Sequence, residues 1–336
     1  MSAADGGLPI VDNGAHGPRG LPLPRRRSYA LRVSVLDACN LRCTYCAPGS
    51  LSSPMQASRW LGAAEHAALA PHFAAAGVRK VRFTGGEPLL RPDLHDVVAA
   101  WRQALPTAEL ALTTNGTRLL EQARSLRAAG IDRVTVHLDT LRRDRYQALM
   151  GKGSPEQVQE GIAVALRTFD EVKLNVVVQR GKNDDELADF LRWSTRTGVQ
   201  VRFIELMRTG SANDVVDDVF MAGREVVQRL GALPRPRREA SDPAALFERD
   251  GVVFGVIASD TESFCSACDR LRLTADGRLR GCLYESGGVP LGEALRHGAS
   301  RDDVAALVVA GVNGKRSFHP STTETRVPFS MAGVGG

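Results

Sequence analysis

The chain of 336 residues lacks any run of about 18 consecutive apolar residues, so the sequence predicts no membrane-spanning helix. It also lacks an apolar segment directly after Arg25, Arg26 and Arg27, which argues against a secretory signal. The net charge of +5 is too small and too diffuse to indicate a nucleic-acid-binding protein. We therefore expect a cytoplasmic protein that has neither a membrane nor a nucleic acid among its partners.

Cysteine is scarce, and the few cysteines are grouped. They form two triads, neither of which has a fourth thiol: Cys39, Cys43 and Cys46, and Cys265, Cys268 and Cys282. Disulfide pairing would leave one thiol of each triad over, which favours a reducing compartment. Three thiolates on a four-iron cluster leave one iron without a protein ligand. Such an iron can bind another molecule, so the arrangement indicates chemistry rather than structural support.

The fold class follows from an alternation of short β-branched runs with helical stretches between residue 30 and about residue 207. The expected strands are Leu31–Leu36, Val81–Thr84, Leu110–Thr113, Val134–Leu138, Val172–Val178 and Val199–Leu206. The expected helices between them include Ala63–Ala76, Leu94–Ala104, Leu119–Ala129, Glu156–Thr168 and Asp184–Thr197. This alternation predicts parallel strands joined by helical crossovers. Six units are fewer than the eight of a closed barrel, so we expect an α/β fold, a partial (βα)6 TIM-like barrel.

The chain divides into three expected regions. Residues 1–28, rich in Gly and Pro, are expected to form a disordered leader, and residues 29–210 to form the partial barrel. Residues 211–336 are expected to form an α+β extension that carries the second triad. This extension has a predicted strand at Val252–Ile257 and a predicted hairpin around Asp276-Gly277.

The expected strands alternate apolar and polar residues, whereas parallel strands buried on both faces read as continuous apolar runs. The apolar positions must face the helices, so the polar positions face the lumen. The polar set contains cations and hydroxyl groups: Arg32, Ser34, Arg82, Thr84, Thr113, Thr135, His137, Lys173 and Asn175. A lumen of this composition predicts a binding site for a polar anion. The alternative is that these are solvated residues of an open sheet.

Two motifs follow the first two expected strands, at the barrel face where such folds place their active sites. The segment Cys39-Asn40-Leu41-Arg42-Cys43-Thr44-Tyr45-Cys46 resembles the cluster loop of radical S-adenosylmethionine (SAM) enzymes, and Thr84-Gly85-Gly86-Glu87-Pro88 resembles their G-G-E-P element. The resemblance implies a 4Fe-4S cluster whose open iron binds SAM, and one-electron cleavage of SAM to a 5′-deoxyadenosyl radical. Zinc is the competing interpretation, but no fourth ligand is visible nearby in the sequence.

The second triad, Cys265-x2-Cys268-x13-Cys282, encloses Arg270 and Arg272. Residues two apart on a strand face the same way, so both guanidinium groups could hold one phosphate chain. The alternative is that the two arginines belong to a solvated strand face.

Residues 29–336 resemble the MoaA family, the GTP 3′,8-cyclases of molybdenum cofactor biosynthesis. The matching stretches follow the family order: Leu31–Val35, Val81–Leu90, Leu112–Gly116, Val172–Val176, Arg202–Met207, Phe264–Cys282 and Gly335-Gly336. The resemblance implies conversion of GTP to (8S)-3′,8-cyclo-7,8-dihydroguanosine 5′-triphosphate, the first step of molybdopterin synthesis. The adenosyl radical would remove the hydrogen from C3′ of GTP, and the ribose radical would attack C8 of the guanine. Two alternatives are a radical SAM paralogue acting on another nucleotide or a peptide, and a non-catalytic metalloprotein.

The resemblance also implies roles for individual residues, none of them catalytic beyond the cluster ligands. GTP contacts are implied for Arg32, Arg82, Thr113, Lys173, Arg270, Leu271 and Arg272. SAM contacts are implied for Tyr45, Gly86, Glu87, His137 and Met207. The triads would hold two 4Fe-4S clusters, the second of which would bind the guanine. The terminal Gly335 and Gly336 would enter the active site and be needed for activity; the alternative is a plain disordered end.

Four residues depart from the family pattern, and none of them is an expected cluster ligand or phosphate-binding cation. His137 replaces a usual serine, Ala38 an arginine, Ala47 a methionine and Asp269 an asparagine. His137 could donate a hydrogen bond to SAM or could be a satisfied histidine without a role. Besides GTP and SAM, the implied partners are an unidentified electron donor and the downstream cyclic pyranopterin monophosphate synthase. A homodimer is compatible with the sequence, which does not fix the oligomeric state.

Overall fold

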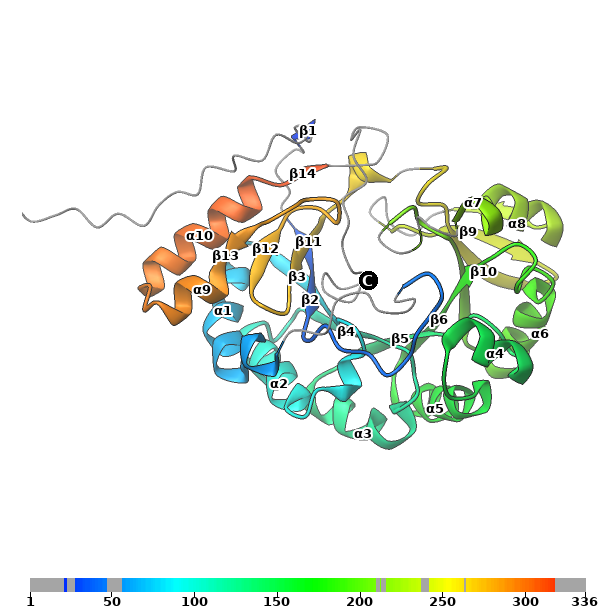
Figure 1. Cartoon of the computed structure of the whole chain (residues 1–336), viewed down its shortest axis with the longest axis horizontal. Coiled ribbons are helices and arrows are strands. Elements are labelled where there is room, and N and C mark those ends of the chain that lie inside the picture. Colours follow the sequence, from blue (N-terminus) through cyan, green and yellow to red (C-terminus); the bar gives the residue numbers. More distant parts are fainter. Residues whose placement is uncertain are drawn as a thin grey trace, which may run out of the picture.

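The computed structural model describes residues 21–22, 28–46, 56–209, 212, 216–236, 242–262 and 264–317. Within these residues the dominant feature is a sheet with the strand order β13-β12-β11-β2-β3-β4-β5-β6-β7-β10-β9-β8. The sheet curves around a central lumen, and the helices lie on its outer face (Figure 1). The arrangement confirms the predicted class, an open α/β barrel.

Six parallel strands that follow one another in the chain form the middle of the sheet. They are β2 (Tyr29–Ser34), β3 (Val78–Thr84), β4 (Glu109–Thr114), β5 (Arg133–His137), β6 (Glu171–Val178) and β7 (Gln200–Glu205). The covering helices are α1 (Ala63–Ala75), α2 (Leu94–Ala104), α3 (Leu119–Ala129), α4 (Arg143–Met150), α5 (Pro155–Thr168) and α6 (Leu187–Thr197). Apart from α4, which the sequence does not predict, these elements agree with the expected ones to within a few residues.

Local sequence explains both the helix ends and the core. Gly130 and Gly198 end α3 and α6 in the left-handed region, with φ of +117° and +81°, where a side chain would be strained. The core lies between the sheet and the helices, where the fully buried Phe73 of α1, Trp101 of α2 and Phe83 of β3 pack together. The Phe73 and Trp101 ring centroids are 5.6 Å apart. This packing fixes the first two helices against the strands that precede the site.

The C-terminal part of the chain extends the parallel sheet at both edges. Strand β11 (Arg270–Leu273) pairs with β2, and β10 (Val252–Ile257) pairs with β7, both in parallel. Antiparallel strands follow outside them: β12 (Arg278–Arg280), β13 (Val289–Pro290), β9 (Ala245–Arg249) and β8 (Leu233–Arg235). The barrel wall is therefore built by both of the expected structured regions.

Besides short 3-10 helices, the remaining described elements are short strands and peripheral helices. They are β1 (Leu21–Pro22), which pairs with β14 (Arg316–Ser317), and α7 (Val216–Val219), α8 (Gly223–Leu230), α9 (Leu291–Arg296) and α10 (Arg301–Asn313). None of the helices in the described part of the chain is long and apolar enough to cross a bilayer. Ala47, the predicted tail Gly335-Gly336 and most of the predicted leader lie outside the described residues.

Candidate active site

A cavity of about 580 Å³ occupies the lumen of the barrel, and both thiol triads open onto it. The first triad comes from the loop after β2, and the second from the segments that precede β11 and follow β12. The lining also includes most of the residues for which the sequence implies GTP or SAM contacts: Arg32, Tyr45, Arg82, Gly86, Thr113, His137, Lys173, Met207, Arg270 and Arg272. The fold thus brings together residues from almost the whole length of the described chain.

The first triad lies in a compact loop against the end of α4. The Cys46 N–H donates to the Cys43 carbonyl at 3.0 Å, and the Leu41 N–H donates to Cys39 Sγ at 3.4 Å. Cys43 Sγ lies 3.8 Å from Met150 Sδ. Burial, helped by the nearby Cys39, raises the pKa of Cys46 to about 12. Buried thiols of this kind become thiolates when a metal binds them.

The donor set fits 4Fe-4S clusters better than single metal ions. All six cysteines are free thiols. Among the described residues, no three His, Cys, Asp or Glu side chains converge closely enough to hold one ion. Each triad supplies three thiolates, which suits a 4Fe-4S cluster with one iron left for another ligand, whereas a structural zinc site takes four protein ligands.

The G-G-E-P element packs against the first cluster loop. A Cβ atom at Gly86 would lie 2.1 Å from the Ala38 carbonyl oxygen, so only glycine fits there. Glu87 does not line the cavity. Its fully buried carboxylate accepts hydrogen bonds from Thr114 Oγ1 and the Asn115 N–H, both at 2.7 Å. Glu87 thus ties together the loops after β3 and β4, and a direct contact with SAM stays a prediction.

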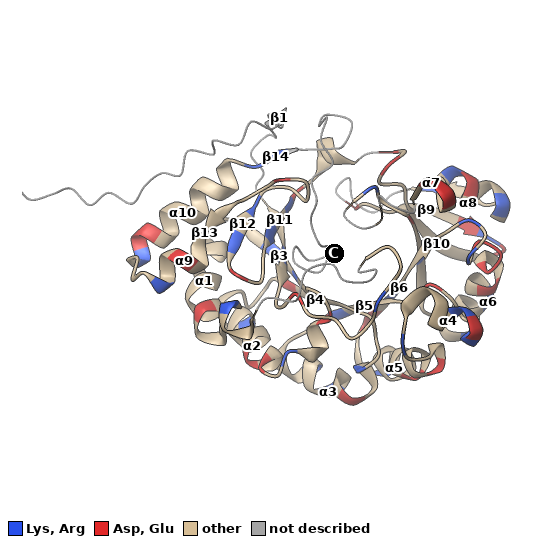
Figure 2. Cartoon of the chain, in the orientation of Figure 1, with Lys and Arg blue, Asp and Glu red and all other residues tan. Residues whose placement is uncertain are grey.

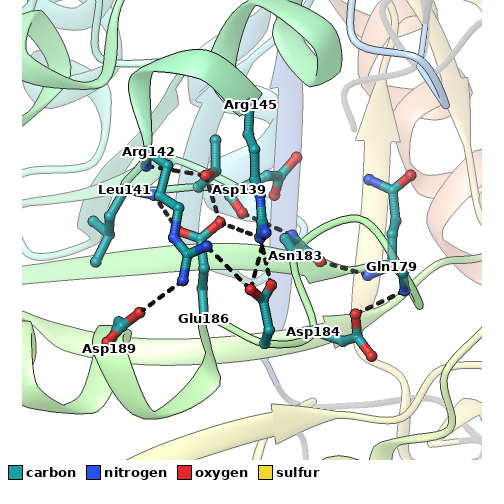
Figure 3. A network of polar contacts seen from close by, with 12 residues as sticks. Asp139, Leu141, Arg142, Arg145, Gln179, Asn183, Asp184, Glu186 and Asp189 are labelled. Atoms are coloured by element: carbon teal, nitrogen blue, oxygen red, sulfur yellow. Dashed lines mark hydrogen bonds and ion pairs between the residues drawn. The ribbon is translucent and has the colours of Figure 1, made fainter.

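Tyr45, His137 and Asp139 form a hydrogen-bonded group beside the first triad. Tyr45 Oη lies 2.5 Å from His137 Nε2 and donates to Asp139 Oδ2 at 2.7 Å. Burial lowers the pKa of His137, but the Asp139 carboxylate outweighs burial and leaves that pKa raised. Asp139 is itself fixed, because the Val177 N–H donates to its carboxylate at 2.7 Å. Asn183 Nδ2 donates to its backbone carbonyl, also at 2.7 Å (Figure 3). The SAM contact implied for His137 stays a prediction.

The contribution of the Tyr45 hydroxyl to stability can be compared with that of the Tyr146 hydroxyl, since both side chains are near the first triad. Replacing Tyr45 with phenylalanine should lower the free energy of unfolding by about 1–3 kcal/mol, because the buried Asp139 carboxylate loses a donor. Tyr146→Phe should be neutral, because the buried Tyr146 hydroxyl has no hydrogen-bond partner in the described part of the chain. Urea unfolding of the two apoproteins measures the difference. Equal losses of stability in both variants would contradict this account.

Three arginines form a row across neighbouring strands of the lumen. Arg272 on β11 is in register with Arg32 on β2, which is in register with Arg82 on β3. Figure 2 shows cationic segments on these strands. Burial, together with the neighbouring cations, lowers the pKa of Arg82 to about 9 and that of Arg272 to about 10. Burying like charges side by side costs free energy, so the row favours a polyanionic ligand.

Arg202 on β7 also faces the cavity, although it is not among the site residues that the sequence predicts. Arg202 Nε donates to Asn175 Oδ1 at 3.0 Å, and Nη2 donates to Thr135 Oγ1 at 3.3 Å. Burial lowers the pKa of Arg202 to about 10. The alternation of the strand could have predicted this position. Arg202 lies between Val201 and Phe203, whose side chains are buried in the core, so its own side chain must face the lumen.

The other predicted GTP-binding residues differ in their surroundings. Lys173 forms an ion pair with Glu171, with the charged atoms 3.1 Å apart. The Arg270 guanidinium lies over the Phe264 ring, 4.6 Å from its centroid. Leu271 is fully buried in the core and does not line the cavity, as expected for the residue between two lumen-facing arginines. Its implied contact with GTP stays a prediction.

Lys315 connects two of the segments that carry the second triad. Its buried Nζ donates to the carbonyl of Arg270 and, at 2.5 Å, to the carbonyl of Gly281, and it lies 3.8 Å from Cys268 Sγ. Glu285 accepts a hydrogen bond from the Gly281 N–H at 2.6 Å. Lys315 thus binds the carbonyl of Gly281 and Glu285 binds its N–H, directly before Cys282. No local motif in the sequence points to Lys315.

Removing the Lys315 ammonium should therefore weaken binding of the second cluster. Lys315→Met leaves two buried carbonyls without their donor, and we expect the iron content after anaerobic reconstitution to fall from about eight toward four per chain. Lys182→Met, on the exposed surface, serves as the matched control and should keep the full iron content. Full iron loading of the Lys315 variant would show that this side chain does not support the cluster.

Comparison with known proteins agrees with the site. Residues 33–194 match the radical SAM superfamily, and residues 199–320 match the family described as Molybdenum Cofactor Synthesis C. A Mycobacterium bovis protein named GTP 3′,8-cyclase 3 is 42% identical, with 84% of this chain and 77% of the relative aligned. The Moorella thermoacetica GTP 3′,8-cyclase is 38% identical, with 93% of this chain and 98% of the relative aligned. The chain belongs to the GTP 3′,8-cyclase family.

Membership in the GTP 3′,8-cyclase family confirms the predicted radical SAM class of enzyme and its cofactors, SAM and 4Fe-4S clusters. Among solved structures, Streptococcus suis SuiB bound to S-adenosylmethionine is 18% identical, with a TM-score of 0.44 over 55% of this chain and 40% of SuiB. That likeness is distant, and the family assignment does not depend on it.

Proposed function

We propose that this protein converts GTP to (8S)-3′,8-cyclo-7,8-dihydroguanosine 5′-triphosphate, the first step of molybdenum cofactor biosynthesis. One observation carries the proposal: two separate thiol triads and a row of arginines line the same cavity. A radical site alone would need one triad, and a nucleotide site alone would need none. The names of the curated relatives, GTP 3′,8-cyclases at 38–42% identity, support the same reaction.

The cysteines of the two triads would hold the two clusters, with SAM at the first and the guanine of GTP at the second. When bound, the first cluster and SAM supply the 5′-deoxyadenosyl radical that starts ring closure between C3′ and C8 of GTP. The arginine row (Arg272, Arg32 and Arg82) binds the triphosphate and so holds the ribose and the base in the lumen. Gly86 and Glu87 keep the loops around the first triad in place. Such positioning is the main contribution of a protein to a radical reaction.

The proposal includes partners beyond the two small molecules. A one-electron donor must reduce the first cluster, and the cyclic pyranopterin monophosphate synthase would take up the product. Free thiols and clusters suit a reducing compartment such as the cytoplasm.

Anaerobic reconstitution with iron and sulfide, followed by SAM, dithionite and GTP, tests the proposal. We expect 5′-deoxyadenosine together with a cyclised guanosine nucleotide, measured by liquid chromatography and mass spectrometry. 5′-Deoxyadenosine without a cyclised nucleotide would indicate a different substrate. Absence of both products from a protein with a full iron content would refute catalysis.

A further inference from the structure

A second cavity adjoins the loop of the first triad. This outer cavity has a volume of about 370 Å³ and is lined by Cys39, Asn40, Leu41, Arg42, Thr117, Arg118, Lys152, Gly153 and Gln157. Cys39 and Leu41 line both the outer cavity and the lumen cavity. The segment that carries the first cluster ligand is therefore the partition between the two.

Hydrogen bonds hold this partition in place. Asn40 Nδ2 donates to Thr117 Oγ1 at 3.0 Å, and Asn115 Nδ2 donates to Asn40 Oδ1 at 2.9 Å. Asn115 Nδ2 also lies 3.8 Å from Cys39 Sγ. A continuous series of polar contacts thus runs from the outer cavity to the sulfur of a predicted cluster ligand.

The outer cavity is positively charged. Arg42, Arg118 and Lys152 come from three different segments and are all exposed, and the described lining contains no Asp or Glu. None of the three forms an ion pair within the described part of the chain. Three exposed cations from separate segments are thus gathered around a hollow beside the first triad, and its described lining offers them no carboxylate.

The exposure of these cations indicates a macromolecular partner rather than a small anion. A site for a small anion would hold it with converging, buried donors, as the arginine row does in the lumen. Exposed like charges around a hollow attract a surface of opposite charge and accelerate its association. The position next to Cys39 gives such a partner access to the first cluster from outside the lumen.

We propose that Arg42, Arg118 and Lys152 form the docking surface for an acidic one-electron donor protein, whose electron reaches the first cluster through Cys39. The donor loses one electron and the cluster gains one, and no bond or proton is transferred in this step. The inference rests on the proposed function, because that reaction requires reduction of the cluster. Beyond the proposed function, the inference specifies the surface at which the electron enters and the negative charge that the donor must carry.

Charge reversal at the rim of the outer cavity tests the proposal. The variant is Arg118→Glu with Lys152→Glu; Arg42 is left unchanged because its guanidinium also donates to the carbonyls of Cys39 and Leu41, both at 3.2 Å. An acidic flavodoxin and dithionite serve as alternative reductants. The matched control, Lys182→Glu with Arg224→Glu, makes the same change in net charge at exposed positions elsewhere.

With flavodoxin, the Arg118/Lys152 variant should reduce its first cluster and form 5′-deoxyadenosine about tenfold more slowly than the wild type. Its flavodoxin complex should be about tenfold weaker, and the wild-type complex should weaken as salt is added. With dithionite, which needs no docking surface, variant and wild type should agree. A flavodoxin-driven rate equal to that of the wild type, or an equal loss in the control, would overturn the proposal.

Failure of this proposal can be distinguished from failure of the proposed function. If wild-type protein with dithionite cyclises no GTP, the proposed function fails. Salt-dependent flavodoxin binding and the rate of cluster reduction, followed by electron paramagnetic resonance, would still decide whether the donor docks at the outer cavity.

Discussion

Cys268→Ala is expected to abolish the cyclised nucleotide while SAM cleavage continues, whereas Cys43→Ala is expected to abolish both products. The two thiols belong to different triads, and each triad would hold one cluster. Loss of a residue that merely supports a metal ligand typically costs 10–100-fold, so loss of a ligand should cost more than about 100-fold. Iron content, 5′-deoxyadenosine and nucleotide product, measured on the same preparations, separate the two variants.

The control for these variants is Met150→Leu, because Met150 contacts Cys43 without serving as a ligand. It should retain about eight irons per chain and form both products. Each cysteine variant should retain about four. If Cys268→Ala still cyclised GTP at the wild-type rate, the second triad would have no part in the reaction. If Cys43→Ala still cleaved SAM, the first triad would not be the SAM site.

Arg82→Met should weaken GTP binding without lowering the stability of the apoprotein. A charge-assisted hydrogen bond to phosphate contributes about 1.5–3 kcal/mol, so the dissociation constant should rise about 10–100-fold. In the apoprotein the half-buried Arg82 guanidinium lies near Arg202, and among the described residues its hydrogen bonds go to the Thr113 and Thr135 hydroxyls, both at 3.1 Å. Methionine removes this charge, and the two threonine hydroxyls can rotate to new partners. Calorimetric titration with GTP and urea unfolding provide the two measurements.

Arg102→Met is the opposite case and serves as the control. Arg102, on α2, donates to Asp132 Oδ2 at 2.6 Å and to the Gly130 carbonyl at 2.7 Å, outside the lumen. Its loss should lower the free energy of unfolding by about 1–3 kcal/mol and leave GTP affinity unchanged. A destabilised Arg82 variant with unchanged GTP affinity would show that the arginine row serves the fold and not the ligand.

Local sequence patterns suffice for the barrel and for part of its site. The period of two in each strand places Arg32, Arg82 and Lys173 in the lumen, and all three line the cavity. The apolar spacing of α2 and α3 predicts these helices to the residue. Strand alternation alone predicts only that the ligand is a polar anion. The resemblance to a known family added the identity of the ligands.

What the sequence does not predict depends on contacts between distant segments. No local pattern shows that β11 pairs with β2, and this pairing is what places Arg272 beside Arg32. The same holds for Lys315, whose partners lie far from it in the sequence. For Glu87, the sequence motif predicts that the residue belongs to the site but not which way its side chain points. In the structure its carboxylate accepts hydrogen bonds from the loop after β4.

The pairing of β11 with β2 and of β10 with β7 also bears on how the protein is made. When the ribosome has synthesised the chain only as far as β7, β2 and β7 are the edge strands of the partial barrel. Their outward-facing backbone donors and acceptors are then unpaired. Exposed edge strands can pair with strands of other chains until the last third of the polypeptide, which contains β10 and β11, has been synthesised and pairs with them. A prematurely terminated product would thus be prone to aggregation and would also lack the second set of thiols.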